Sequence, residues 1–154
     1  MQHIHVCLAL RQRCGSCWAF STTGAVEGAY FTATNQSVSL SEEELVQCSK
    51  WGNEGCAGGE MTRAFGWIER NGICLETADP YTSGNGITGS CRDASATCAS
   101  NVTIGGFTRV RRGDEDALRA AVAQQPVSVG IEANRHFFQV TLNTKAHTLR
   151  LALG

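Results

Sequence analysis

The chain has 154 residues, of which 42% are hydrophobic and 18% charged, and its formal net charge at pH 7 is −1. These values fit one ordinary globular domain with a packed core. The near-neutral charge offers no basic surface for nucleic acid or an anionic membrane, and no apolar run approaches the length of a membrane span. Neither nucleic acid nor a membrane is therefore an expected partner.

Eight cysteines in a chain of this size favour disulfides and an oxidising compartment. The tripeptides Asn35-Gln36-Ser37 and Asn101-Val102-Thr103 are glycosylation sequons, which support that compartment weakly because such tripeptides are common by chance. No usable signal peptide precedes Arg13, since the apolar stretch from Val6 to Leu10 is too short for one. Any export signal is therefore expected to lie outside these residues.

Residues 1–13 show no periodicity, and they contain His3, His5 and Cys7. Two histidines without further ligands are weak grounds for a metal site, and none is predicted. The next residues are more informative, because Cys17 follows a Gly-Ser turn and apolar positions recur at helical spacing to about Phe31. A helix N-terminus stabilises an anion such as a thiolate, so Cys17 is the candidate nucleophile. A purely structural role for Cys14 and Cys17 is the alternative.

Further helices are predicted downstream. Ser41 and Glu44 form a capping box, and helix initiation accounts for the acidic residues 42–44 without a catalytic role. Met61 opens an amphipathic helix that Asn71-Gly72 should end, and a short helix begins at residues 114–116 and ends before Pro126. Gly24 and Gly28 suggest close packing against the first helix. Strands are predicted from apolar positions at 102, 104, 107 and 110, and from alternation over residues 127–131.

The segment Cys14-Gly15-Ser16-Cys17-Trp18, continued by residues 19–21, resembles the active-site segment of the papain family of cysteine peptidases. The resemblance covers roughly residues 14–139 and implies an α+β fold. It assigns residues 14–104 to the helical lobe and residues 105–139 to part of a β-barrel lobe. Residues 1–13 and 140–154 are then a divergent N-terminal segment and a divergent C-terminal tail.

Roles for individual residues follow from this resemblance. It implies that Cys17 attacks the peptide carbonyl, that Gly59 with Gly58 beside it binds the substrate backbone, and that Met61 lines the main specificity pocket. Met61 also suits an ordinary core position. No cofactor is implied, and the expected partner is a peptide or protein substrate. The expected location is secreted, lysosomal or vacuolar, and the oligomeric state is not predicted.

The resemblance also implies disulfides. Cys14 should pair with Cys56, and Cys48 with Cys91, although Cys98 is a possible substitute for Cys91. Cys74 and Cys98 could form an extra bridge, which would leave Cys7 over. A zinc site is the rival use of these thiols, but the chain has no second closely spaced pair beside the one at residues 14 and 17.

The remaining catalytic groups are harder to find. A histidine base is expected roughly 130 to 150 residues after the nucleophile, where His147 is the candidate. The sequence around His147 nevertheless favours an unrelated tail residue, because residues 138–153 lack the glycines and cysteine of the family loop, and His136 fits worse. The family glutamine that stabilises the oxyanion is replaced by Arg11, with Gln12 displaced by one position.

These observations predict a papain-like cysteine endopeptidase homologue that would hydrolyse peptide bonds through a Cys17 thioester. They also predict that the chain is truncated and inactive, because the catalytic histidine and asparagine are not identifiable. One alternative is a non-catalytic remnant that binds peptides or regulates a relative. The other is a thiol-disulfide oxidoreductase that uses Cys14 and Cys17, which is disfavoured because the second cysteine, not the first, opens the helix.

Overall fold

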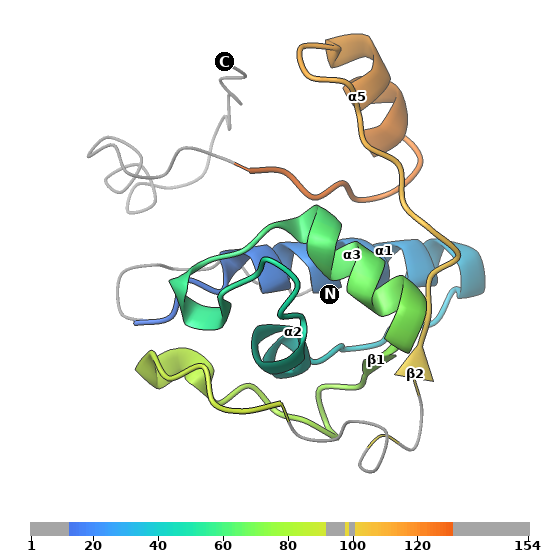
Figure 1. Ribbon diagram of the computed structural model, residues 1–154. Coiled ribbons are helices and arrows are strands. Elements are labelled where there is room, and N and C mark those ends of the chain that lie inside the picture. The colour runs from blue at the N-terminus through green and yellow to red at the C-terminus, as the bar shows by residue number, and fades with distance from the viewer. Residues whose placement is uncertain (1–12, 92–97, 99–100, 131–154) are drawn as a thin grey trace, which may run out of the picture.

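The structure is a computed structural model that describes residues 13–91, 98 and 101–130 (Figure 1). Helices α1 (Cys17–Thr34), α2 (Glu42–Cys48) and α3 (Met61–Asn71) pack together, and α5 (Glu115–Val122) lies apart from them at the end of an extended segment. A two-stranded antiparallel sheet joins β1 (Ile73–Cys74) to β2 (Asn101–Val102), with Ile73 opposite Val102. None of the helices in the described ranges has both the length and the apolar character needed to cross a bilayer.

Helix α1 spans Cys17–Thr34 and confirms the helix predicted to begin at Cys17. Its buried face begins with Trp18 and Ala19 and continues to Val26, and it packs against α3 and α2. The helix ends at Asn35, which has a left-handed backbone with φ of 56°, and the Asn35 N–H donates to the Phe31 carbonyl. Asparagine tolerates this conformation better than most residues, so it makes a suitable C-terminal cap.

The two glycines of α1 have different surroundings. A Cβ atom on Gly28 would lie 2.3 Å from Cγ of Pro126, so the packing predicted for this position is present. A Cβ atom on Gly24 would meet nothing within 4 Å among the described residues. The same prediction is therefore wrong at Gly24, which faces open space.

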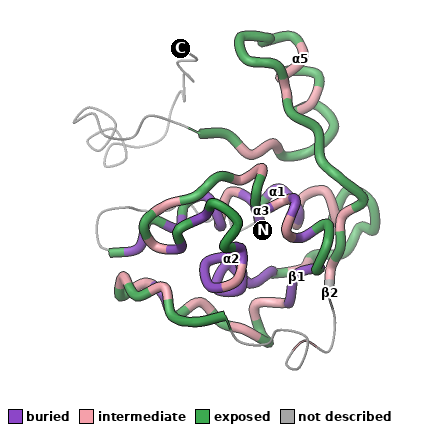
Figure 2. Tube along the Cα trace, in the orientation of Figure 1, coloured by how far each residue is buried: buried purple, intermediate pink, exposed green. Residues whose placement is uncertain are grey.

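Helix α2 spans Glu42–Cys48 and is the most thoroughly buried helix of the described chain (Figure 2). The Ser41 hydroxyl accepts from the Glu44 N–H, as a capping box requires. The reciprocal half of the box is wrong, because Glu44 accepts from the Cys74 N–H while the Ser41 N–H donates to the Cys74 carbonyl. Cys74 of β1 therefore binds both groups that the capping box would pair with each other. Helix initiation alone does not explain why residues 42–44 are glutamates.

Helix α3 spans Met61–Asn71 and ends at Gly72, whose φ of 75° favours glycine. Both features confirm the sequence prediction. Strand β1, Ile73–Cys74, follows directly and pairs with β2, Asn101–Val102. The single turns η1, Gly55–Ala57, and η2, Ser83–Asn85, lie in the loops on either side of α3 and β1.

Two strand predictions fail in the described residues. Only Asn101–Val102 of the first stretch is a strand, since β1 offers a partner only two residues long, and Phe107 instead stacks on Phe65 with ring centroids 5.6 Å apart. Residues 127–130 are not a strand either, and residue 131 lies outside the described ranges. An alternating pattern forms a strand only where another strand supplies its hydrogen bonds.

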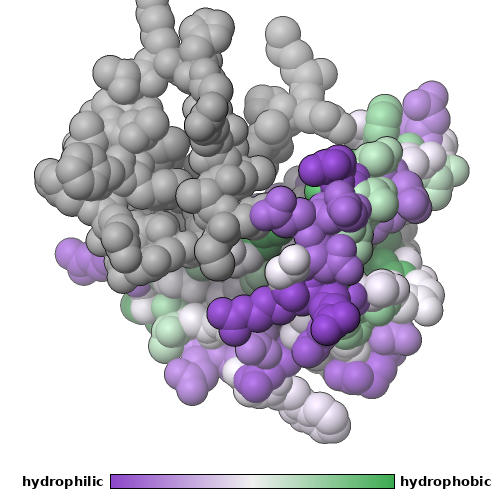
Figure 3. Space-filling model, turned by 90° about the horizontal axis from the view of Figure 1, so that it is seen from above, coloured by the Kyte–Doolittle hydropathy of each residue, from purple (hydrophilic) through white to green (hydrophobic). Residues whose placement is uncertain are grey.

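Helix α5 spans Glu115–Val122, and Asp114 caps it by accepting from the Ala117 N–H at 2.9 Å, so the predicted helix is confirmed. None of its residues is buried. On the face seen in Figure 3, hydrophilic side chains predominate among the described residues and hydrophobic ones form small patches between them. The core of the described structure therefore lies among α1, α2, α3 and β1.

Candidate active site

Cys17 is the first residue of α1, and its side chain is exposed. The preceding residue, Ser16, is the N-cap but makes no capping hydrogen bond, because its hydroxyl lies 2.6 Å from the Tyr81 hydroxyl. Ser16 is fully buried in this contact. The first N–H groups of a helix have no acceptor within the helix, so those of Cys17 and Trp18 remain available for an anion.

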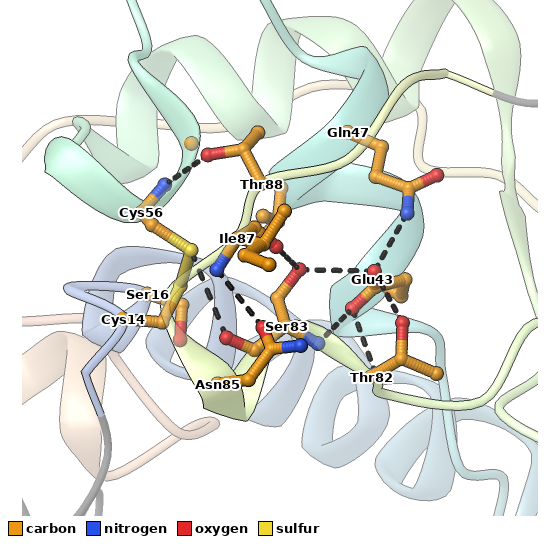
Figure 4. Close-up of a disulfide and its surroundings, with 12 residues drawn as sticks. Cys14, Ser16, Glu43, Gln47, Cys56, Thr82, Ser83, Asn85, Ile87 and Thr88 are labelled. Atoms are coloured by element: carbon orange, nitrogen blue, oxygen red, sulfur yellow. Dashed lines mark hydrogen bonds between the residues drawn. A yellow bond between two sulfur atoms is a disulfide. The ribbon is translucent and has the colours of Figure 1, made fainter.

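A disulfide between Cys14 and Cys56 joins this helix start to the loop of residues 53–60 (Figure 4). Beside it, the Gly15 N–H donates to the Cys56 carbonyl at 2.8 Å. A Cβ atom on Gly15 would lie 2.8 Å from the same carbonyl oxygen, so only glycine allows the two backbones to approach this closely. The covalent and the backbone contact together fix the start of α1 against the loop.

Trp18 makes the second connection to this loop. It is buried, and its indole N–H donates to the Gly55 carbonyl at 3.1 Å. A Cβ atom on Gly59 would lie 2.6 Å from the indole ring, so the glycine is required by the packing of Trp18. The Glu60 N–H donates to the buried amide oxygen of Asn53 at 2.8 Å, which closes the loop. We call residues Gly58 and Gly59 the glycine shelf.

The glycine shelf supplies a stability prediction. Gly59→Ala should lower the free energy of unfolding by about 1 to 3 kcal/mol, because the new methyl group overlaps the Trp18 ring. Gly24→Ala is the matched control, since its methyl group meets nothing and alanine favours a helix interior by about 0.5 to 1 kcal/mol. Urea unfolding of both variants measures the difference. Equal stability of the two variants would contradict the contact.

A second loop, residues 81–88, is attached to the same place by hydrogen bonds. The Thr88 hydroxyl accepts from the Cys56 N–H at 3.0 Å, and Tyr81 contacts Ser16 as described above. The ring of Tyr81 also meets Phe20 edge to face, with centroids 5.0 Å apart. Aromatic contacts of this geometry stabilise packing. The start of α1 is thus held from two sides, while the Cys17 side chain stays exposed.

The same loop is anchored next to Tyr81 by Glu43 of α2 (Figure 4). The Glu43 carboxylate is 1% exposed and accepts five hydrogen bonds, from the backbone and hydroxyl groups of Thr82 and Ser83 and from the Gln47 amide. Burial raises the pKa of Glu43, but the hydrogen bonds from Thr82 and Ser83 outweigh it and the pKa lies below its ordinary value. Glu43 is therefore held as a carboxylate.

The comparisons with known proteins agree with this geometry. The sequence pattern of the papain family cysteine protease matches residues 7–147. The chain belongs to this family. KDEL-tailed cysteine endopeptidase CEP2 of Arabidopsis thaliana is 53% identical over 128 residues, which are 82% of this chain and 34% of that protein. Cathepsin L of Sarcophaga peregrina is 48% identical over 130 residues, which are 82% of this chain and 37% of that protein.

Solved structures of papain-family proteins confirm the predicted papain-like fold. The Carica candamarcensis cysteine protease CMS1MS2, in complex with E-64, has a TM-score of 0.76 and 40% identity, covering 84% of this chain and 59% of that chain. Digestive procathepsin L 3 of Tenebrio molitor has a TM-score of 0.65 and 41% identity, covering 75% of this chain and 37% of that chain. The chain spans about a third of the length of the curated relatives it matches.

Six cysteines of this papain-family chain form three disulfides within the described residues. Besides Cys14–Cys56, these are Cys48–Cys91 and Cys74–Cys98, so Cys98 does not substitute for Cys91. Cys17 is the free cysteine of the described ranges, and Cys7 lies outside them. Glu44, Cys74 and Cys98 bring ligand atoms close together, but the two sulfurs are bonded to each other and offer no thiolate for a metal ion.

Several predicted site residues have no described position. Arg11, Gln12, His136 and His147 all lie outside the described ranges, so the structure places neither the base nor a side-chain oxyanion donor. Met61 is half-buried at the start of α3 and packs against the core, directly after the glycine shelf and Glu60.

Sequence reasoning missed the contacts that hold the site. Tyr81 reaches Ser16 across 65 positions of the sequence, and no local pattern pairs residues so far apart. The roles of Glu42 and Glu43 were missed for the same reason. Glu42 accepts from the Thr23 hydroxyl of α1 at 2.7 Å, and burial raises its pKa to about 7. Burial likewise raises the pKa of Glu44.

Proposed function

We propose that this chain carries the nucleophile and the substrate shelf of a papain-like cysteine endopeptidase that acts on peptides or proteins. The observation that carries the proposal is the position of Cys17, which is exposed and free at the first turn of α1 while the other described cysteines are oxidised. Two relatives are themselves named as an endopeptidase and a cathepsin. A thiol at a helix N-terminus suits attack on a carbonyl carbon.

In the proposed reaction, the Cys17 sulfur attacks the carbonyl carbon of a peptide bond. The tetrahedral intermediate then expels the amine, which leaves a thioester that water hydrolyses. The Cys17 N–H is one donor for the oxyanion, because the Ser16 hydroxyl does not cap this end of α1. Gln12 is the proposed second donor, and losing one such donor typically costs about 2.7 to 4 kcal/mol of the barrier.

We assign substrate binding to the glycine shelf. Gly59 is exposed, and the side on which a side chain would project is taken up by Trp18, so we propose that an extended peptide meets its backbone on the open side. Gly58 has a φ of 127°, a conformation that side chains rarely adopt. Met61 follows at the start of α3, and its half-buried side chain suits the wall of a pocket for one substrate residue.

The thiol needs a base, for which His147 is the proposed residue. A second proposal concerns the chain of 154 residues by itself. We expect its Cys17 thiol to react with electrophiles, but we do not expect the chain to hydrolyse peptides. Its basis is that the residues around His147 do not match the family loop that carries the base, because residues 138–153 contain neither glycine nor cysteine. A chain with that behaviour could still bind peptides, which is the non-catalytic alternative.

The redox alternative is disfavoured, because Cys14 is bonded to Cys56 and is 4% exposed.

We further propose that the protein is made in the secretory pathway and works in an extracellular, vacuolar or lysosomal compartment. Three disulfides within the described residues are typical of an oxidising route. One relative is named KDEL-tailed, and a C-terminal KDEL sequence is a signal of that pathway.

Labelling by a peptidyl electrophile tests the proposed nucleophile. The chain is prepared as the Cys7→Ser variant, which removes the one other cysteine outside the three disulfides, and its intact mass is measured after reaction. We expect one adduct, and none after Cys17→Ala. An unchanged adduct in Cys17→Ala would overturn the assignment.

Turnover assays on the same preparation test the second proposal. We expect neither cleavage of a dipeptide substrate nor reduction of insulin. Cleavage abolished by both Cys17→Ala and His147→Ala would overturn the proposed inactivity and establish His147 as the base. Rapid insulin reduction would favour the redox alternative.

A further inference from the structure

The sequon Asn35-Gln36-Ser37 lies on the surface. Its three residues follow the last turn of α1, and every one of them is exposed (Figure 2). Residues 36–39 form neither helix nor strand. The Asn35 backbone N–H is used by the helix cap, but its side-chain amide makes no hydrogen bond to the described residues. The acceptor amide is therefore presented to solvent on an irregular stretch of backbone.

The sequon Asn101-Val102-Thr103 has different surroundings. Asn101 and Val102 are β2, and Asn101 is in register with Cys74 of β1. Cys74 is in turn bonded to Cys98, three positions before Asn101 in the sequence. The backbone of this sequon is thus held against the lobe by a strand pairing and a nearby disulfide. It cannot leave the lobe without breaking the strand pairing with β1.

We propose that Asn35 is a site of N-linked glycosylation and that Asn101 is not modified, or only in a small fraction of molecules. The acceptor tripeptide is read by an enzyme that transfers an oligosaccharide from a lipid pyrophosphate carrier. The Asn35 amide nitrogen loses one proton and forms a bond to the first carbon of the sugar. The bond between that carbon and the pyrophosphate oxygen breaks, and the lipid pyrophosphate leaves.

The position of Asn35 is compatible with the proposed peptidase site. Cys17 and Asn35 lie at opposite ends of α1, and an 18-residue helix is about 27 Å long at 1.5 Å per residue. A glycan at Asn35 would therefore extend from the end of α1 farthest from the glycine shelf. We expect it to leave labelling of Cys17 unchanged.

Expression through a eukaryotic secretory pathway, with a signal sequence added to the full chain, tests the proposal. This route is supplied by the experiment, although the natural occurrence of the glycan depends on the secretory assignment proposed above. We expect one glycan, seen as a mass shift that peptide N-glycosidase removes. Labelling of Cys17 in the same material reports separately on the proposed peptidase site.

The choice of variants follows from the structure. Asn35→Gln would strain a left-handed backbone position, so Asn35→Gly is used because glycine keeps the helix cap. Ser37→Ala retains Asn35 and removes only the sequon hydroxyl. Both should abolish the mass shift, whereas Asn101→Gln should leave it unchanged. A shift that survives Asn35→Gly and Ser37→Ala, full occupancy of Asn101, or secretion of a disulfide-bonded chain without any glycan would overturn the proposal.

Discussion

Replacing Glu43 with alanine should lower the free energy of unfolding by about 3 to 5 kcal/mol, which is a large part of the stability of a typical domain. The carboxylate is 1% exposed and accepts hydrogen bonds from Thr82, Ser83 and Gln47 at 2.6 to 3.0 Å. Hydrogen bonds to a charged group contribute about 1.5 to 3 kcal/mol each, and all five donors, including those of the buried residues Ser83 and Gln47, would lose their acceptor together.

Urea unfolding with the disulfides intact measures this effect. Glu69→Ala is the matched control, because Glu69 is exposed on α3 and its removal should change the unfolding free energy by less than about 0.5 kcal/mol. The loss in Glu43→Ala should also reach the site, since Glu43 anchors the loop that carries Tyr81 and Thr88. A Glu43→Ala variant within 1 kcal/mol of the control would show that the network contributes little.

Glu42 should make the chain less stable as pH rises. Its pKa is raised from 4.5 to about 7 by burial, which the hydrogen bond from Thr23 only partly offsets, and the nearby carboxylates of Glu76 and Glu27 raise it further. The folded chain therefore binds a proton that the unfolded chain has released between pH 4.5 and 7. The contribution of this bound proton to the free energy of unfolding is fully present below pH 4.5 and is lost as pH rises to 7. The loss amounts to at most about 1.4 kcal/mol per pH unit and to about 3 kcal/mol in total.

Glu42→Gln isolates this effect. Glutamine is neutral at every pH and its amide oxygen can still accept from the Thr23 hydroxyl, so the variant should be more stable than the parent chain by about 3 kcal/mol above pH 7 and similar to it at pH 4. Urea midpoints of both chains at pH 4, 5.5, 7 and 8 provide the comparison. Part of the slope should remain, because the pKa of Glu44 is also raised. Parallel pH profiles of the two chains would contradict the assignment to Glu42.

The parts of the fold that the sequence predicts correctly rest on local patterns. The helix that begins at Cys17, the helix that ends at Gly72 and the cap at Asp114 all depend on residues within a few positions of one another. Such signals act over one or two helical turns, so they survive without knowledge of the tertiary structure. The family motif around Cys17 extends this to the fold, because the chain matches the papain family over residues 7–147.

The parts that sequence reasoning could not reach depend on distant partners. Glu44 looks like a capping residue, but its carboxylate accepts from the Cys74 N–H of β1, and the Ser41 N–H donates to the Cys74 carbonyl instead. The contact of Ser16 with Tyr81 could not be predicted from local sequence patterns either, since 65 positions separate the two residues. The alternation at residues 127–130 predicts a strand, but only a neighbouring strand could make it one.

The concentration dependence of Cys17 alkylation tests the central claim most directly. In the Cys7→Ser chain, a peptidyl electrophile should react with a rate that saturates, because the reagent first binds along the glycine shelf and then meets the sulfur. The unfolded chain should react with a rate that rises linearly, and Gly59→Ala should need a higher reagent concentration for half-saturation. A native chain that reacts linearly, with the slope of the unfolded chain, would show that the fold does not make Cys17 a substrate-directed nucleophile.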